Sequence, residues 1–185
     1  MPDGEKIFRN FLSLWKSLPR DSNGLPRRNG LGPGLAPALM PHLFLARVQG
    51  EYEIEIRLMG SALEGKAGMQ LTGSNYFDQL ARESWRFYED FINGYRLHPC
   101  AGRIARHVGS REGLTYDLHT LAAPLADEAG EASFIVGVSY MRANHEESAG
   151  RRGSGLGAIA AGDALVVEAR YIDLGFGTPA ALPAY

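Results

Sequence analysis

The chain has 185 residues, of which 45% are hydrophobic and 22% are charged, and this balance is typical of one globular domain with a substantial core. The formal net charge of -2 gives no basic excess to neutralise phosphates, so nucleic-acid binding is not expected. The single cysteine, Cys100, excludes a disulfide within the chain and a zinc site made of cysteines.

The first residues lack the charged and then apolar plan of a signal peptide. No apolar run approaches the roughly 20 residues that a membrane helix needs, and a single cysteine suits a reducing compartment. We therefore expect a cytoplasmic protein that does not bind a membrane.

An amphipathic helix is predicted over residues 1–18. Its apolar residues recur at three- and four-residue spacing, and Ile7, Phe11 and Trp15 form one stripe. This stripe must be covered, either by the sheet of this domain or by a second subunit, and it is a candidate interface. Residues 19–41 are rich in proline and glycine and are predicted to be an extended linker.

Two strands joined by a short turn open the main body, which we place at residues 42–141. Residues 42–48 are mostly apolar, and residues 52–58 alternate between apolar and charged side chains, as in a strand with one buried face. Short helical turns, interrupted by glycines, are predicted over residues 61–76. A long helix is then predicted over residues 78–93, with its aromatic side chains towards one side.

Turn residues separate three further strands, which are predicted at 100–109, 113–123 and 132–141. Residues 142–163 are rich in glycine and charge and are predicted to be a flexible loop, and residues 164–185 to be a last strand and tail. Strands on both sides of a helical middle favour an α+β fold. We expect a five-stranded antiparallel sheet, an N-terminal helix and an extra C-terminal strand.

Several short segments occur in a characteristic order along the chain. They are Trp15 and residues 39–45, 56–61, 68–73, 121–125 and 171–175. With these segments the chain resembles the single-domain PAS-like family that is widespread in alphaproteobacteria. The resemblance implies a PAS-like fold and a role in sensing or regulation, and it specifies neither a reaction nor a ligand.

In a PAS fold the long helix would face the concave sheet, and a partial gap between them would hold a small apolar ligand. The residues that we expect to line this gap are Trp85, Tyr88, Ile104, Leu118, Val136 and Val138. The same side chains also fit a filled core, in which case the domain binds no ligand.

Neither haem binding nor flavin adduct chemistry is expected, and the sequence identifies no other cofactor. Haem-binding PAS domains usually hold the iron through a histidine on the long helix, and residues 78–93 contain none. Flavin photoreceptors of this kind need a reactive cysteine early in that helix, whereas Cys100 follows it. The histidines lack the short spacing typical of metal ligands, so no metal site is expected.

These patterns favour a PAS-type sensory or regulatory domain without catalytic residues of its own. It would bind a small apolar ligand or a partner, either a second copy of itself or a signalling protein, and the stripe of the first helix would make the contact. One alternative is an enzyme with a small cavity, whose polar groups would be Tyr88, His107, Asp117 and His119. The other is an interaction module with a filled core.

Overall fold

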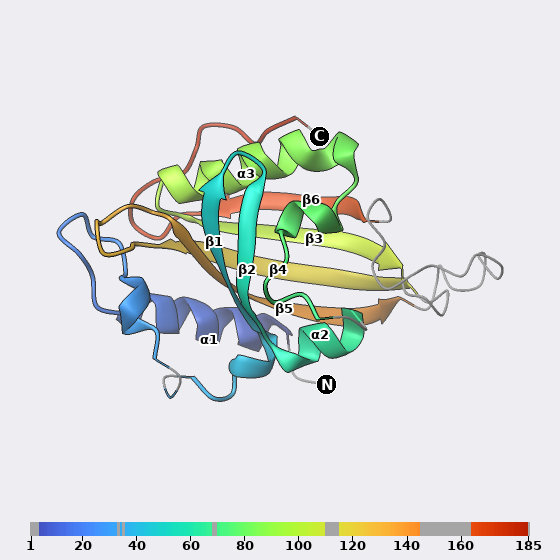
Figure 1. The fold of residues 1–185 in the computed structure, drawn as a ribbon, viewed down its shortest axis with the longest axis horizontal. Helices are drawn as coiled ribbons and strands as arrows, with labels where there is room; N and C mark the ends of the chain where they lie inside the picture. Colours follow the sequence, from blue (N-terminus) through green and yellow to red (C-terminus); the bar gives the residue numbers. More distant parts are fainter. Residues whose placement is uncertain are drawn as a thin grey trace.

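The computed structural model describes residues 4–32, 34, 36–67, 70–109, 115–144 and 164–184. Its helices are α1 (Gly4–Ser17), α2 (Ser61–Ala67) and α3 (Trp85–Leu97) (Figure 1). Its strands are β1 (Leu43–Gly50), β2 (Glu53–Met59), β3 (Ala101–Gly109), β4 (Thr115–Leu125), β5 (Phe134–Asn144) and β6 (Leu165–Ile172). Most of the loop predicted at 142–163 lies outside the described residues.

The described strands form one antiparallel sheet of six strands in the order β2-β1-β5-β4-β3-β6. The helical middle of the chain separates β2 from β3, and β5 returns to lie between β1 and β4 (Figure 1). β6 pairs with the outer edge of β3. The predicted α+β fold, a five-stranded antiparallel sheet with an N-terminal helix and an extra C-terminal strand, is confirmed.

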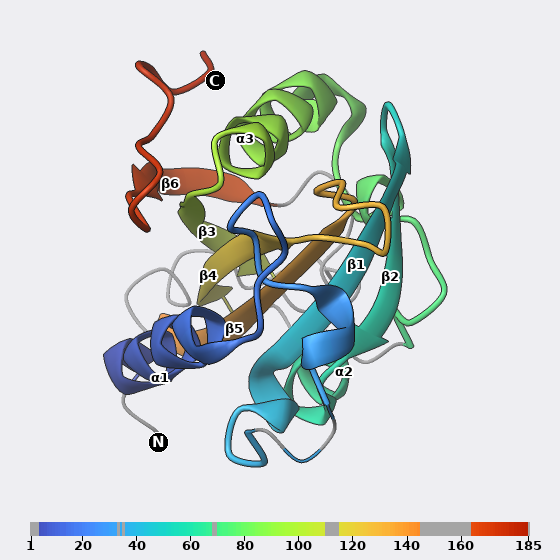
Figure 2. The same ribbon diagram turned by 90° about the vertical axis from the view of Figure 1, so that its left-hand side faces the viewer.

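The two faces of the sheet carry separate cores, because side chains alternate between the faces along each strand. Figure 2 shows α1 on one face and α3 on the other. On the α1 side the helix packs with Leu121, Val136 and Val138. On the α3 side Phe91 and its neighbours pack with Ile104, and this second core surrounds a cavity.

The apolar stripe of α1 is buried within the domain. Ile7 is 5% exposed, and Phe11 and Trp15 are 0% exposed. The Trp15 indole Nε1 donates a hydrogen bond to the Pro124 carbonyl at 2.9 Å, so a buried polar contact as well as apolar area holds the helix on β4. These side chains pack against the sheet of their own domain, the first of the two coverings expected, and their assignment as candidates for an interface with a second subunit or partner is corrected.

Residues 19–41 are not a free linker, because they pack on the same body. Leu39 is buried. The Arg28 N–H donates to the Ala126 carbonyl, and the Ala126 N–H donates to the Pro26 carbonyl, each at 2.8 Å. These bonds satisfy backbone groups in a stretch where proline and glycine allow only short 3-10 turns, such as Arg28–Gly30.

The long helix is displaced towards the C-terminus relative to the predicted 78–93. Residues 76–79 and 82–84 form short 3-10 turns instead of its first turns. Gly94 does not end the helix but lies inside α3, where a side chain would collide with the Tyr171 ring from β6. Gly94 therefore serves a close contact between α3 and β6.

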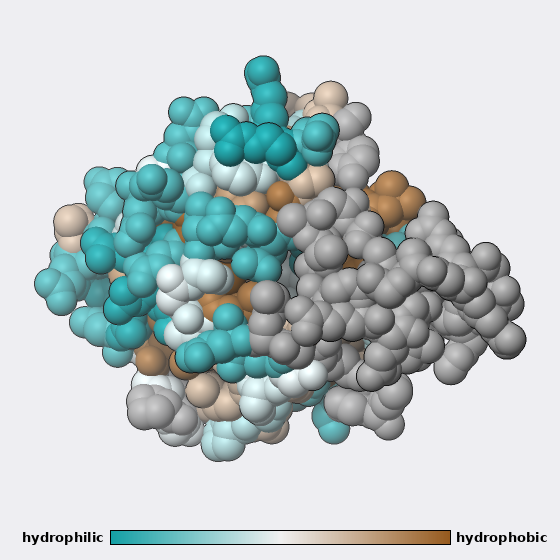
Figure 3. All heavy atoms as spheres, turned by 45° about the vertical axis from the view of Figure 1, so that its right-hand side comes forward, coloured by the Kyte–Doolittle hydropathy of each residue, from teal (hydrophilic) through white to brown (hydrophobic). Residues whose placement is uncertain are grey.

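The face drawn in Figure 3 shows hydrophobic surface, in brown, in small areas between hydrophilic side chains in teal. The large apolar side chains that are exposed in the described part of the chain are Leu97, Leu165, Val167, Phe176 and Leu182. Within the described residues, no helix is long and apolar enough to cross a membrane.

Candidate functional site

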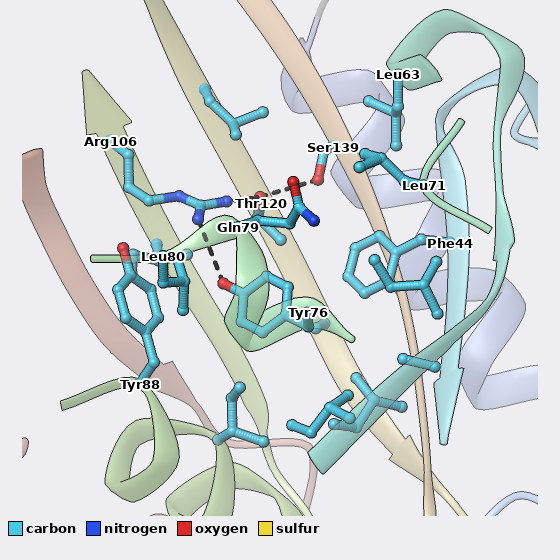
Figure 4. A pocket seen from close by; sticks show the side chains of 18 of the residues that line it. Phe44, Leu63, Leu71, Tyr76, Gln79, Leu80, Tyr88, Arg106, Thr120 and Ser139 are labelled. Atoms are coloured by element: carbon cyan, nitrogen blue, oxygen red, sulfur yellow. Dashed lines mark hydrogen bonds between the residues drawn. The ribbon is translucent and has the colours of Figure 1, made fainter. Parts of the chain in front are cut away.

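A cavity of about 150 Å³ lies between the sheet and α3 (Figure 4). Side chains of β1 to β5 form its floor, and α2, α3 and the 3-10 turn at Tyr76–Gln79 form its other walls. The cavity is therefore on the face of the sheet opposite α1.

A row of small residues crosses the sheet beneath this space. Gly102 on β3 pairs with Ala122 on β4, which pairs with Gly137 on β5. A methyl group added at Gly102 would collide with the Tyr95 ring, and one added at Gly137 would lie 2.5 Å from the Phe44 ring. The small residues thus let aromatic rings lie directly on the sheet, and the rings in turn bound the cavity.

Most of the cavity lining is aliphatic or aromatic. Ile54 and Ile56 come from β2, Phe91 and Ile92 from α3, and Leu118 from β4. All of them are buried. Walls of this kind favour an apolar ligand, because burying apolar surface away from water is the main source of binding energy in such a site.

One end of the cavity is polar. Leaving tyrosine aside, the buried polar residues among those described are Arg106, Thr120 and Ser139, and all of them line the cavity. The hydroxyl oxygens of Thr120 and Ser139 are 2.8 Å apart. Arg106 Nη2 donates to Thr120 Oγ1 at 3.5 Å, and Nη1 donates to the Tyr76 hydroxyl at 3.3 Å (Figure 4).

Arg106 places a positive charge inside the second core. The residue is 8% exposed, and its guanidinium carbon lies 5.7 Å from the centre of the Tyr88 ring, within the range of a cation–π contact. Burial alone would lower the pKa of Arg106, but the phenol groups of Tyr76 and Tyr88 outweigh burial and raise it. The guanidinium therefore stays charged.

Tyr88, Ile104 and Leu118, which the sequence places at the cavity, do line it. Trp85 is not part of the lining. Its ring packs against Phe77 with centroids 5.3 Å apart, and its Nε1 donates to a backbone carbonyl at 3.2 Å. Trp85 therefore supports the start of α3 next to the cavity.

Val136 and Val138 do not line the cavity, and this expectation is corrected. Both belong to the core on the α1 side of the sheet. Their neighbours Ile135 and Ser139 face the cavity instead. A shift of one residue in the assumed phase of a strand exchanges its two faces, and that is the error here.

The polar groups of the small-cavity enzyme alternative are divided between the two faces of the sheet. Tyr88 lines the cavity. His107 Nδ1 and Asp117 Oδ1 are 2.6 Å apart on neighbouring strands, away from the cavity lining. His119 stacks on Tyr140, with ring centroids 4.8 Å apart, and Tyr140 belongs to the core on the α1 side. These groups do not form one site.

Cys100 is fully buried, and burial raises the pKa of its thiol to about 11. The thiol is therefore protonated at neutral pH and is a poor nucleophile. In the part of the chain that the structure describes, no group of three or more His, Cys, Asp or Glu side chains could hold a metal ion.

The polar end of the cavity is missing from the residues predicted for the site. The sequence does carry a signal for Arg106, because it lies at two-residue spacing between the buried Ile104 and Val108. A strand that buries those two residues must bury the side chain between them as well. Thr120 and Ser139 give no such signal, since small hydroxyl residues occur on both faces of strands.

A family model described as "PAS domain" matches residues 5–140 of the chain. One chain of known structure, described as "Flavin Analogue Sheds Light on Light-Oxygen-Voltage Domain Mechanism", is 13% identical with a TM-score of 0.46, and the match covers 62% of this chain and 85% of that chain. None of the curated proteins matches. The residues matched by the family model include α1 and 19–41, in agreement with their packing on the sheet.

Proposed function

This chain belongs to the PAS domain family, and from that premise we propose that it is a sensory or regulatory domain that binds a small apolar ligand between α3 and the sheet. The family supports a role in signalling. Binding would be passed on by contact with a partner, either a second copy of the chain or a signalling protein.

The observation that carries this proposal is the cavity. A closely packed core leaves few spaces larger than a water molecule, whereas this one contains about 150 Å³ between apolar walls. An engineered apolar cavity of about 150 Å³ in another protein stays dry and binds benzene. The volume therefore supports a ligand with the bulk of one aromatic ring or a short acyl chain.

β4 and β5 connect the cavity with α1. Thr120 and Ser139 face the cavity, and the adjacent residues Leu121 and Val138 pack in the α1 core. A ligand that shifts these strands would therefore change the support of α1 on the opposite face. The outer side of α1 is the surface at which a partner would detect that change.

Native mass spectrometry of the chain purified from the organism that makes it tests the proposal. We expect the protein to carry the additional mass of a small molecule. The Ala122→Leu variant should lose that mass, because Ala122 lies beneath the cavity and a larger side chain fills it.

Ala181→Leu is the matched control, because it makes the same substitution at an exposed position of the C-terminal tail. It should carry the ligand like the unmodified protein. If repeated preparations contain only the mass of the chain, the domain acts as an interaction module without a ligand and the proposal fails.

A further inference from the structure

We infer that the ligand is a small amphipathic carboxylate, with its carboxylate group on Arg106 and its apolar body between α3 and the sheet. The inference rests on the proposed function, because it requires the cavity to be a binding site. It adds the chemical class that the site selects.

No described residue gives Arg106 the counter-ion that a buried guanidinium normally has. Among the described residues it forms no ion pair with an aspartate or a glutamate. Its contacts to the neutral hydroxyls of Tyr76 and Thr120 are long, at 3.3 and 3.5 Å, and the hydroxyl of Tyr88, which also acts on the guanidinium, is neutral as well. Its Nε is buried and has no hydrogen-bond partner in the described part of the chain.

Arg103, on the same strand, shows the contrast. It faces the α1 side, where its Nη2 lies 2.7 Å from Glu5 Oε1; its Nε, like that of Arg106, has no hydrogen-bond partner in the described part of the chain, so the contrast lies in the carboxylate. The arginine on the α1 side thus has a carboxylate, and in the described part of the chain Arg106 on the cavity side has none. Next to Arg106 the pairing of β3 with β6 also shifts register, an irregularity that is common beside binding sites.

A carboxylate satisfies this polar end better than other small groups. A buried charge without a counter-ion is unfavourable, and a carboxylate can accept parallel hydrogen bonds from Nε and one Nη of a guanidinium. The hydroxyls of Thr120 and Ser139 lie at the same end and can donate to its oxygens (Figure 4). One buried positive charge matches one negative charge, so a monoanion fits.

The other residues of the cavity lining determine the size and polarity of the rest of the ligand. Beyond the polar end, the walls are apolar side chains such as Phe44, Ile56 and Phe91. The volume of about 150 Å³ admits one aromatic ring or a short acyl chain. The ligand is therefore an aromatic or a short-chain monocarboxylate. One probe of each kind distinguishes an aromatic body from an acyl chain.

Calorimetric titration at pH 7.5 with matched pairs of probes tests the inference. The acids are benzoate and hexanoate, and the neutral partners of the same shape are benzamide and hexanamide. We expect at least one acid to bind about tenfold to a hundredfold more tightly than its amide, which is the advantage of hydrogen bonds to a buried charge.

Variants assign the preference to Arg106. Arg106→Met keeps an unbranched side chain but removes the charge, so the acid should lose its advantage while the amide binds as before. Arg106→Lys should restore part of the preference. Arg103→Met is the control, because it removes an arginine from the opposite face and should leave the preference intact. Circular dichroism verifies that each variant is folded.

The outcomes separate the two proposals. Equal affinity for an acid and its amide, or an acid preference that persists in Arg106→Met, would overturn the carboxylate inference and leave the ligand-binding function standing. Loss of all binding in Ala122→Leu would locate the probes in the cavity. If no probe binds to a chain that also carries no ligand when purified, the proposed function itself is wrong.

Discussion

His119 is a titrating group in a partly buried place. It stacks on Tyr140 on the α1 side of β4, with ring centroids 4.8 Å apart. Burial lowers its pKa from the ordinary value of 6.5, and the nearby charges, which act in both directions, are Asp117, Arg103, Arg142 and Glu168. Because the folded state binds the proton less tightly than the unfolded chain, protonation favours unfolding.

The contribution of neutral His119 to stability is therefore complete above pH 6.5 and is lost as the pH falls towards the lower pKa of the folded state. His119→Phe keeps an aromatic ring against Tyr140 and removes the titration. We expect the free energy of unfolding of this variant, measured in urea at pH 7.5 and pH 5.5, to decrease less with acid than that of the unmodified protein.

His98→Gln is the control for this experiment, because it removes a histidine from an exposed position after α3. An equal change in the pH dependence of this variant would show that the effect is not specific to His119. An unchanged pH dependence in His119→Phe would show that the acid sensitivity arises elsewhere.

Prediction of the cavity residues depended on the phase of each strand. Ile104 and Leu118 were assigned to the correct face. β5 offered no such guide, because Ile135 and Val136 are both buried and lie on opposite faces of the sheet. A central strand with two buried faces does not alternate between apolar and polar residues, so its phase cannot be read from the sequence.

At the scale of elements, α1 is an integral part of the domain. Phe11 is 0% exposed and contributes to the core between α1 and the sheet. Phe11→Ala should lower the free energy of unfolding by about 3–5 kcal/mol, because it removes a large buried side chain and leaves a cavity. Urea unfolding measures this loss.

Ser13→Ala is the control on the exposed side of the same helix. It should leave stability almost unchanged, because alanine favours a helix and no buried contact is lost. If Phe11→Ala keeps its stability but changes its mass in solution, the stripe of α1 forms an interface between subunits and not a core.

The elements differed in how well the sequence predicted them. The strands were found because turn residues separate β1 from β2, β3 from β4 and β4 from β5. The start of α3 was misplaced, because the 3-10 turns at 76–79 and 82–84 have the composition of a helix. The packing of residues 19–41 was missed, because isolated apolar residues such as Leu39 have no periodicity in an irregular segment.

At the scale of the whole molecule, one sheet serves two cores. The α1 core and the cavity core share β4 and β5, whose residues alternate between them. A change in the cavity and a change in α1 therefore act on the same strands. The antiparallel sheet and its helical layers were predictable, and the spacing of Arg106 carried a signal for its burial, whereas the hydroxyl groups that meet it at one end of the cavity depended on the side-chain packing of several elements.

β6 lies beyond residues 5–140, to which the family model extends, yet it pairs with β3 from Ala101↔Ile172 to His107↔Leu165. A chain that ends at Asn144 would expose the N–H and C=O groups of β3 along this edge. We expect it to aggregate in size-exclusion chromatography, because open edge strands pair with other chains.

A chain that ends at Leu174 retains β6 and should elute like the unmodified protein. A monomeric, equally stable chain ending at Asn144 would show that β6 is dispensable. The practical consequence concerns grafting. A domain of this protein that is transferred into a designed fusion should include its last strand. A fusion cut at the bounds of the family match would lack β6, and the unpaired edge of β3 could then bind other chains.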